Sequence, residues 1–482
     1  MRSTTDICII GGGPAGSVLA ARLAQLGHDV SLVERAAFPR RHLGESLSPG
    51  VLPLLATVGV RTAITSAGFT PVRAVTVNWD NGQQQREDPA GQGLLVDRGH
   101  FDRLLLDHAR AAGVRVFQPA TVAAKALHDD AWNLRIEADG CPVELRAAFL
   151  ADATGRAAFL RSDRRQTGCR TVALHAYWQG RDLPTQPRIE AGAAEWYWGV
   201  PLPHGLYNTL VFLDAARFRA DRANLLRAGF HALIESSGLL AGCNEARFLG
   251  RVVAADATPY LDGESVTPRS IKVGDAALAL DPLSSSGVQK AIQTALSGAV
   301  VVNTLLRKPE TGEAALLFYR DRLRESSEQH RKWAAGHYGT IAAHRAGKFW
   351  RERAADLPSS ASALPSREPI DHRTLSEAPL VLSPKVAFVD LPCLEGAFVR
   401  VKAAVQHPAL EGPVAYLGNW ELAPLLHHVR AGMTSQQVAL AWSPAIPLDA
   451  GRAIARWLVG RGILVPRVAA QPDGLGPGRP TA

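Results

Sequence analysis

The stretch DICIIGGGPAGSVLAARLAQLGHDVSLVER, residues 6–35, constrains the fold more than any other part of the chain. Residues 7–10 form a short apolar run that is typical of a buried parallel strand. Residues 17–25 are rich in alanine and leucine, which favours a helix, and Gly27 ends it. Residues 30–33 give a second buried strand. The order predicts a strand–helix–strand unit and therefore an α/β fold built on a parallel sheet.

Glycines occupy the turn between the first strand and its helix. Gly11, Gly13 and Gly16 match the pattern G-x-G-x-x-G, and Glu34 ends the second strand. The first glycine permits the tight turn, the second lets a pyrophosphate approach the backbone, and the third lets helix and strand pack closely. The helix N-terminus attracts phosphate, and the acid can accept hydrogen bonds from a ribose. We therefore predict a dinucleotide site. Because the chain opens on this unit and has no second such motif, we favour FAD over the NAD of a dehydrogenase.

The composition is that of an ordinary globular protein. The 482 residues suggest about two or three domains, and 46% of them are hydrophobic. The net charge of +8 is spread thinly, so we expect no nucleic-acid partner. The five cysteines lack C-x-x-C spacing, which argues against disulfides and a metal site and fits a reducing cytoplasm. We see no signal peptide and no apolar run long enough to span a membrane, and the sequence does not indicate an oligomeric state.

Three distant segments carry further motifs. FPRRHLGESLSPG, residues 38–50, follows the acidic strand end. LLVDRGHFDRLLLDHARAAGVRV, residues 94–116, predicts a helix that starts near Arg98. RSIKVGDAALALDPLSSSGVQKAIQTALSGAVVV, residues 269–302, predicts a short strand, a Gly-Asp break and a long helix from Gly287.

Together these segments resemble the flavoprotein monooxygenase superfamily, which includes aromatic hydroxylases, geranylgeranyl reductases and flavin-dependent halogenases. In that family an Arg of an R-x-x-F-D segment lies along FAD, which Arg98 matches, and the Asp of a G-D segment binds the ribityl chain, which Asp275 matches. A D-P-x-x-S-x-G stretch, here residues 281–287, lies against the flavin ring, where a helix N-terminus would stabilise negative charge. The resemblance covers residues 6 to about 340. It implies a Rossmann-like FAD domain of the glutathione-reductase type, interleaved with a β-sheet substrate domain.

The motifs and the resemblance give one set of expected FAD contacts. These are Gly11, Gly13, Pro14, Ala15, Gly16, Glu34, Arg35, Arg41, Ser46, Arg98, Val122, Asp275, Pro282, Ser285, Ser286, Gly287 and Val288. The resemblance also implies that NAD(P)H reduces the flavin, directly or through a flavin reductase, and that O2 is the co-substrate.

The sequence EWYWGVP, residues 195–201, points to one branch of the family. Halogenases carry W-x-W-x-I-P near the flavin, and Trp196, Trp198 and Pro201 match it with valine in place of isoleucine. Halogenases also use a lysine between flavin and substrate, but the corresponding stretch, residues 68–82, holds only Arg73. A guanidinium is a poor substitute for that ammonium. The missing lysine therefore argues against halogenation.

A halogenase-like body without that lysine resembles the flavoproteins that mature tryptophylquinone cofactors. The implied reaction hydroxylates a tryptophan in a precursor polypeptide through a flavin C4a-hydroperoxide, and the polypeptide is presented alone or with another maturation enzyme. We expect acid–base chemistry from Glu45, His42 and Asp281. We expect Trp196, Trp198, Pro201 and His175 to line the substrate channel. The alternatives are a halogenase or hydroxylase of a small or carrier-bound aromatic, a geranylgeranyl-type reductase, and a flavin-carrying protein that only delivers a peptide.

The C-terminal third adds a mainly helical module. Thr434 and Gln437 form a capping box, and the order helix, helix, helix, strand is that of a winged-helix module, which could recognise a peptide or simply cap the enzyme. We predict the following organisation: FAD domain 1–75, 95–165 and 250–312; substrate sheet 76–94 and 166–249; long helices 313–356; linker 357–379; winged-helix-like domain 380–467; disordered tail 468–482.

Overall fold

The chain folds into two compact units, which the computed structural model describes over residues 2–40, 42–80, 82–87, 91–138, 140–161, 163–345, 347–355 and 378–467. The first unit comprises Met1–Ser359 with Gly396–Val399, and the second comprises Ser360–Glu395 with Arg400–Ala482. The predicted linker 357–379, except its last two residues, and the predicted tail 468–482 lie outside the described residues. No described helix is both long and apolar enough to cross a membrane.

The first sheet of the larger unit carries the predicted strand–helix–strand pattern. Its order is β19-β20-β11-β1-β2-β8, and all pairs from β20 to β8 are parallel. The strand β10 extends it through antiparallel pairing with β11, and β9 pairs antiparallel with β10. The bounds are β1 Arg2–Ile10, β2 Val30–Val33, β8 Arg115–Phe117, β9 Ala120–His128, β10 Ala131–Ala138, β11 Cys141–Asp152, β19 Val266–Thr267 and β20 Ser270–Lys272.

Long helices bury this sheet, and α1 packs against α4 and α8 in one apolar core. The bounds are α1 Pro14–Gln25, α2 Val51–Thr57, α3 Arg61–Thr65, α4 Arg98–Ala111, α8 Gly287–Arg307, α9 Gly312–Ala342 and α10 Lys348–Ala354. The first helix starts at Pro14 rather than at residue 17, because proline is pre-organised for the first helical turn. Asp97 caps α4, since its carboxylate accepts a 2.7 Å hydrogen bond from the His100 amide.

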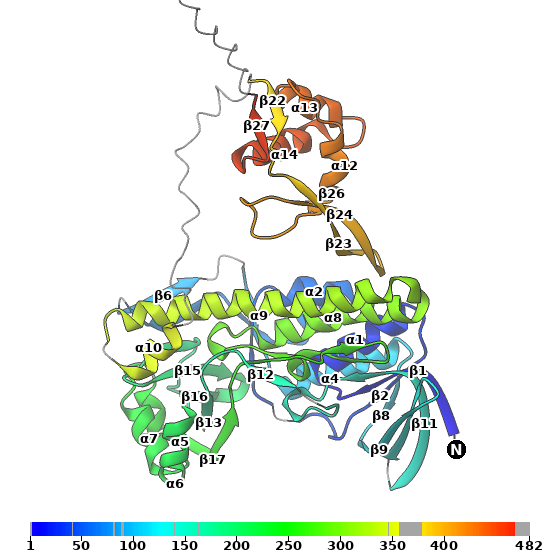
Figure 1. Cartoon of the computed structure of the whole chain (residues 1–482). Helices are drawn as coiled ribbons and strands as arrows, with labels where there is room; N and C mark the ends of the chain where they lie inside the picture. The colour runs from blue at the N-terminus through cyan, green and yellow to red at the C-terminus, as the bar shows by residue number, and fades with distance from the viewer. Residues whose placement is uncertain are drawn as a thin grey trace, which may run out of the picture. The chain divides into compact units, whose positions relative to one another are not determined.

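The second sheet, called here the substrate sheet after its predicted role, has the order β17-β13-β16-β15-β14-β5-β6. The bounds are β5 Ala74–Asn78, β6 Gln83–Glu87, β13 Thr171–Gln179, β14 Arg188–Ala191, β15 Glu195–Leu202, β16 Leu206–Asp214 and β17 Arg247–Asp256. The short helices α5 Ala215–Ala220, α6 Arg222–Leu225 and α7 Ala228–Glu235 lie together beside this sheet (Figure 1). β17 stays in the second sheet up to Asp256, past the boundary that we placed at residue 250, because it pairs with β13 along its length.

Two small three-stranded sheets complete the larger unit. The first is β3 Ser46–Leu47, β7 Gly93–Leu95 and β4 Thr70–Val72, and the second is β12 Arg164–Gln166, β18 Tyr260–Asp262 and β21 Leu278–Ala279. The pairing of β3 with β7 brings the segment after residue 42 next to the chain that leads into α4.

The smaller unit has the predicted order of three helices and a strand. The helices are α12 Leu422–His427, α13 Ser435–Trp442 and α14 Leu448–Gly460, and β27 Leu464–Pro466 pairs with β22 Leu380–Leu382. The expected capping box is present at the start of α13, where Thr434 and Gln437 bond each other's backbone amides. Two further hairpins precede the helices, namely β23 Ala387–Glu395 with β24 Phe398–Gln406 and β25 Tyr416–Leu417 with β26 Trp420–Glu421.

Candidate functional site

One large cavity of about 830 Å³, called here the central cavity, lies in the larger unit between the FAD-type sheet and the substrate sheet. It joins most of the predicted site residues, although they come from five distant segments. The predicted residues that line it are Gly11, Gly13, Pro14, Ala15, Glu34, Arg35, His42, Glu45, Ser46, Arg98, Val122, Trp198, Asp275, Asp281, Pro282, Ser285, Gly287 and Val288. Gly16, His175, Trp196, Pro201 and Ser286 do not line it, and Arg41 lies outside the described residues.

The three glycines of the first turn differ in what surrounds them. A Cβ on Gly11 would lie 2.5 Å from the Ala153 carbonyl oxygen, and Gly11 has a φ of +105°. A Cβ on Gly16 would lie 1.9 Å from the Gly11 carbonyl oxygen. In contrast, a Cβ on Gly13 would meet only the end of the Arg40 side chain at 3.6 Å. Gly11 and Gly16 are therefore required by the packing of the chain itself, whereas Gly13 leaves open space at the N-terminus of α1.

The acid at the end of β2 is held rigidly beside that helix N-terminus. Glu34 is 4% exposed, and its two carboxylate oxygens accept hydrogen bonds from the Gly12 amide at 2.6 Å and the Ala36 amide at 2.8 Å. Each carboxylate oxygen can still accept another hydrogen bond. Glu34 therefore keeps capacity for a ribose hydroxyl, next to free amides that suit phosphate.

Arg98 orders the loop that carries Glu45. Its guanidinium forms a bidentate ion pair with Asp102, at 2.9 and 3.1 Å, and donates at 2.5 Å to the Leu43 carbonyl oxygen. On the opposite side of the cavity, the Lys290 ammonium lies 2.8 Å from the Asp275 carboxylate. Asp102 could have been predicted from its spacing of four residues after Arg98 on one helix. Lys290 had no such signal.

Glu45 is a buried carboxyl that joins the two parts of the larger unit. It is 5% exposed, and it accepts hydrogen bonds from the Tyr177 hydroxyl at 2.8 Å and the Asn208 amide at 3.0 Å. Tyr177 and Asn208 are direct neighbours across the pair β13–β16, so both side chains reach the same side of the sheet. Burial raises the pKa of Glu45, and the two hydrogen bonds oppose that effect. Neither partner could be recognised from its local sequence.

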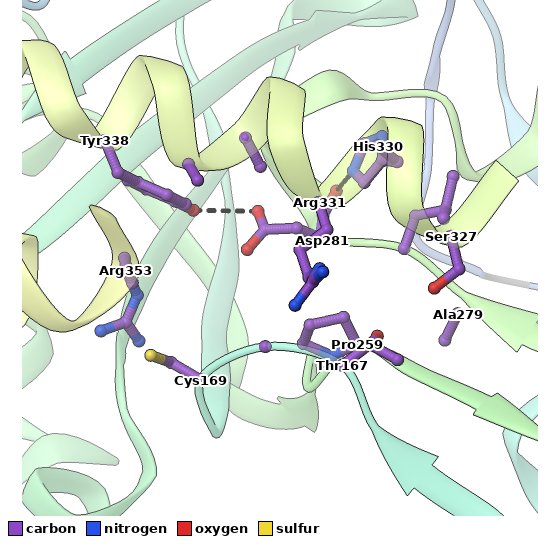
Figure 2. A pocket seen from close by; sticks show the side chains of 14 residues that line it. Thr167, Cys169, Pro259, Ala279, Asp281, Ser327, His330, Arg331, Tyr338 and Arg353 are labelled. Carbon is purple, nitrogen blue, oxygen red and sulfur yellow. Dashed lines mark hydrogen bonds between the residues drawn. The ribbon is translucent and has the colours of Figure 1, made fainter. Parts of the chain in front are cut away.

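Asp281 is the second carboxyl on the cavity wall, and it is half-buried. Its Oδ1 accepts hydrogen bonds from the Leu283 amide at 3.0 Å and from the Tyr338 hydroxyl at 2.9 Å, as Figure 2 shows for Tyr338. Burial raises the pKa of Asp281, although both hydrogen bonds lower it. The third candidate, His42, is exposed, and its Nδ1 lies 2.9 Å from the Leu43 carbonyl oxygen. Glu45 and Asp281 are therefore the groups best suited to hold a proton inside the cavity.

The two indoles of EWYWGVP do share one face of β15, but only Trp198 reaches the central cavity. Trp196 is 1% exposed and stacks on Phe212 with ring centroids 3.8 Å apart. Trp79 contacts its edge, with centroids 6.5 Å apart. The expectation that both indoles wall the channel is therefore wrong for Trp196, because this part of the strand packs in an aromatic core with Trp350 instead.

His175 was expected in the channel; it lies on the same face of β13 as Ala173, but it is not on the cavity wall. It is 9% exposed, and no described group bonds its Nδ1. Burial lowers the pKa of His175 from 6.5 to about 4. Its position among the side chains of neighbouring strands explains the difference, since the cavity opens beside Ala173 instead.

This burial predicts a loss of stability in acid. The folded pKa is below the unfolded one, so His175 stabilises the fold fully above about pH 6.5, and this contribution is lost as pH falls toward 4. Between about pH 7 and pH 5 the loss is about 2 kcal/mol, an order-of-magnitude figure. In urea unfolding, the free energy of unfolding should fall less between these two pH values for His175→Phe than for the parent, by about that amount. The matched variant His128→Gln, at an exposed histidine, should keep the parent dependence. Equal slopes for both variants would contradict the assignment.

The wall opposite the glycine turn is largely apolar. Ala173, Trp198, Leu210, Phe212 and Ala257 line it. The cavity thus has two regions. The first is lined by the glycine turn, which attracts anions, and by Glu34 at the end of β2. The second, called here the apolar chamber, is lined by the apolar residues just named and also holds the carboxyls of Glu45 and Asp281. This arrangement fits FAD, whose pyrophosphate needs the first region and whose ring needs the helix N-terminus at Gly287. Among the described residues, no three His, Cys, Asp or Glu side chains group as metal ligands.

Known proteins share these features. The family profile described as the FAD binding domain matches residues 4–177. A tryptophan 2-halogenase of Chondromyces crocatus is 29% identical over 342 residues, which cover 66% of this chain and 65% of that protein. The flavin-dependent halogenase armH3 of Armillaria mellea is 30% identical over 369 residues, covering 66% and 71%. The chain therefore spans just under two thirds of the length of the first of these relatives.

Solved structures extend the similarity over almost the whole chain. The peptidyl tryptophan dihydroxylase QhpG, essential for tryptophylquinone cofactor biogenesis, has a TM-score of 0.73 and 30% identity and covers 95% of this chain and 100% of that one. The flavin-dependent halogenase CmlS shares the fold, with a TM-score of 0.76 at 22% identity over 99% and 98% of the two chains. The chain therefore belongs to the flavin-dependent halogenase-like family of monooxygenase flavoproteins and is an FAD-dependent oxidoreductase.

Proposed function

We infer that this protein hydroxylates a tryptophan side chain within a peptide or small protein precursor, as a step in the formation of a tryptophylquinone cofactor. The observation that carries this proposal is the combination of extent and sequence identity in the similarity to the peptidyl tryptophan dihydroxylase. That similarity includes 95% of this chain and 100% of the dihydroxylase at 30% identity, whereas the halogenase structure that covers 99% of this chain is only 22% identical. The two halogenase sequences match 66% of this chain each. The C-terminal unit therefore has a counterpart in a protein that acts on a polypeptide.

The site chemistry supports oxygen transfer. Bound FAD supplies the two electrons that reduce O2, and an oxygen atom is transferred to the substrate. The apolar wall with Trp198, Leu210 and Phe212 excludes water and gives an indole a surface to pack on. Glu45 and Asp281 can hold or accept a proton inside this dry space. Glu45 is suited to accept the proton that the indole ring loses, because it lines the central cavity where the loop 43–46 meets the substrate sheet.

Halogenation of a small or carrier-bound aromatic is the second candidate. The sequence relatives named above are halogenases, and the W-x-W-x-V-P stretch resembles theirs. Against it, residues 68–82 contain no lysine, and Arg73, which stands in that stretch, is exposed and does not line the central cavity. The functional distinction therefore depends on which atom is added to the substrate.

One experiment separates the two candidates. The FAD-loaded enzyme, with NADH, a flavin reductase, O2 and chloride and bromide salts, is given tryptophan-containing precursor peptides encoded beside its gene. We expect tandem mass spectrometry to find one or two added oxygen atoms on a single tryptophan. The same peptide with phenylalanine at that position should stay unmodified. A chlorine or bromine isotope pattern on the peptide or on free tryptophan would contradict hydroxylation.

A further inference from the structure

A small pocket adjoins the central cavity at residues 279–281, which line both spaces. It has a volume of about 30 Å³ and is called here the Asp281 pocket. The side chains that the argument uses are those of Asp281, His330, Tyr338 and Arg353, which Figure 2 labels, together with Ala335.

The Asp281 carboxylate is only half satisfied by the protein. The Leu283 amide and the Tyr338 hydroxyl both donate to the same oxygen, Oδ1. Among the described residues, no group donates to Oδ2. His330 fixes the backbone at the same point, because its Nε2 lies 3.0 Å from the Asp281 carbonyl oxygen. The carboxyl is therefore held in one orientation and keeps one oxygen available.

Arg353 has a buried hydrogen-bond donor that lacks an acceptor among the described residues. It is 4% exposed, and its terminal nitrogens donate to the Phe349 carbonyl oxygen at 3.2 Å and to the Thr171 hydroxyl at 3.0 Å. Among the described residues, its Nε–H has no acceptor. A buried donor at a charged group that lacks a partner destabilises the folded chain. A nearby ligand that accepts this hydrogen bond would remove that destabilisation.

We propose that the Asp281 pocket is a built site for one water molecule, which accepts a hydrogen bond from the Arg353 Nε–H and donates one to Asp281 Oδ2. A pocket needs roughly 10–15 Å³ of space for water centres and two to four polar partners to hold a water. Its volume of about 30 Å³ meets this requirement. The Asp281 carboxylate on its wall disfavours an anion in the same place.

The water gives the central cavity a proton route to solvent, and this part rests on the hydroxylation proposed above. The balanced reaction is R–H + O2 + 2e⁻ + 2H⁺ → R–OH + H2O. The O–O bond breaks, a C–O bond forms, the ring proton is released, and protons must enter a chamber that excludes water. Asp281 would pass them, because it touches both spaces. His330 is half-buried and Arg331 is exposed, so the outer wall of the pocket reaches the surface. Arg353 acts as a positioning residue for the water.

A direct test needs no turnover. A crystal structure of the FAD-loaded protein at a resolution of about 1.5 Å should show a single water within about 3.2 Å of both Asp281 Oδ2 and Arg353 Nε. The same crystals soaked in bromide should show no anomalous peak in the pocket. An empty pocket, or a bromide ion in place of water, overturns the proposal. This result stands whether the enzyme hydroxylates or halogenates its substrate.

A functional test fills the pocket instead of removing its charges. Ala335 is 2% exposed and lines the pocket, so Ala335→Val should displace the water. We expect kcat to fall about 10-fold and more H2O2 to be released, with KM and FAD affinity unchanged. The neighbouring variant Gly336→Ala, whose Cβ would meet nothing within 4 Å, should behave like the parent. Arg353→Lys keeps the charge but lacks Nε–H, and it should reproduce the defect if the valine variant does not fold. Parent-like kcat and H2O2 release in a folded variant would exclude the proton route.

Discussion

Gly13→Ala is expected to lower the affinity for FAD about 100-fold while leaving the fold intact. Gly13 is the N-cap of α1, with a φ of −71° that alanine adopts without strain. Its Cβ would meet only the flexible end of Arg40, at 3.6 Å, and the methyl group would stand on the wall of the central cavity. The pyrophosphate must approach the backbone at that point. A 100-fold loss corresponds to about 2.7 kcal/mol, a reasonable cost for displacing the phosphates from the α1 amides.

Gly16→Ala makes the informative comparison, because it should damage the fold as well as the affinity. Its Cβ would lie 1.9 Å from the Gly11 carbonyl oxygen and 3.0 Å from the Ala153 Cβ, so backbone would have to move. We expect destabilisation of at least about 3 kcal/mol. FAD titration by flavin fluorescence and thermal unfolding of the FAD-free chain measure the two effects separately. Gly336→Ala serves as the control in both. If Gly13→Ala binds FAD like the parent, the pyrophosphate does not lie at the α1 N-terminus.

The strand–helix–strand unit could be predicted because every level of the sequence agreed on it. The apolar runs set strands, the glycines set the turn, and Glu34 closed the pattern, all within 30 residues of chain. Local signals also gave the α4 start, the α8 start at Gly287 and the capping box of α13. Each of these depends on neighbours in sequence, which a single sequence displays directly.

The surroundings of Glu45, Asp281 and the two indoles could not be predicted, since they depend on contacts between distant segments. Glu45 meets Tyr177 and Asn208 across more than 130 residues, and Asp281 meets Tyr338 across 57. The alternation along β15 correctly placed both indoles on one face. It could not tell that the neighbouring segments bury Trp196 under Trp79 and leave Trp198 at the cavity.

Glu45→Gln is expected to lower the rate of hydroxylation by about 100-fold or more, in the range typical of general acid–base groups. The substitution is almost isosteric, and the surroundings can accept it. The Tyr177 hydroxyl can still donate to the new amide oxygen. Asn208 can rotate its amide, because its Oδ1 has no donor among the described residues and could then accept from the Gln amide. FAD affinity and the thermal midpoint should therefore stay close to those of the parent, so that the loss reports the missing proton acceptor.

The pH dependence distinguishes a catalytic carboxyl from a structural clamp. A base must be ionised, and burial raises the pKa of Glu45, so the rate should fall on the acid side at a higher pH than an ordinary glutamate would give. Tyr177→Phe removes a hydrogen bond that lowers this pKa, so that acid limb should move to still higher pH while the plateau rate above it is kept. In Glu45→Gln the limb should disappear along with most of the rate. A glutamine variant with parent activity would show that Glu45 only ties the loop 43–46 to the substrate sheet. Asp281 would then be the remaining candidate base on the cavity wall.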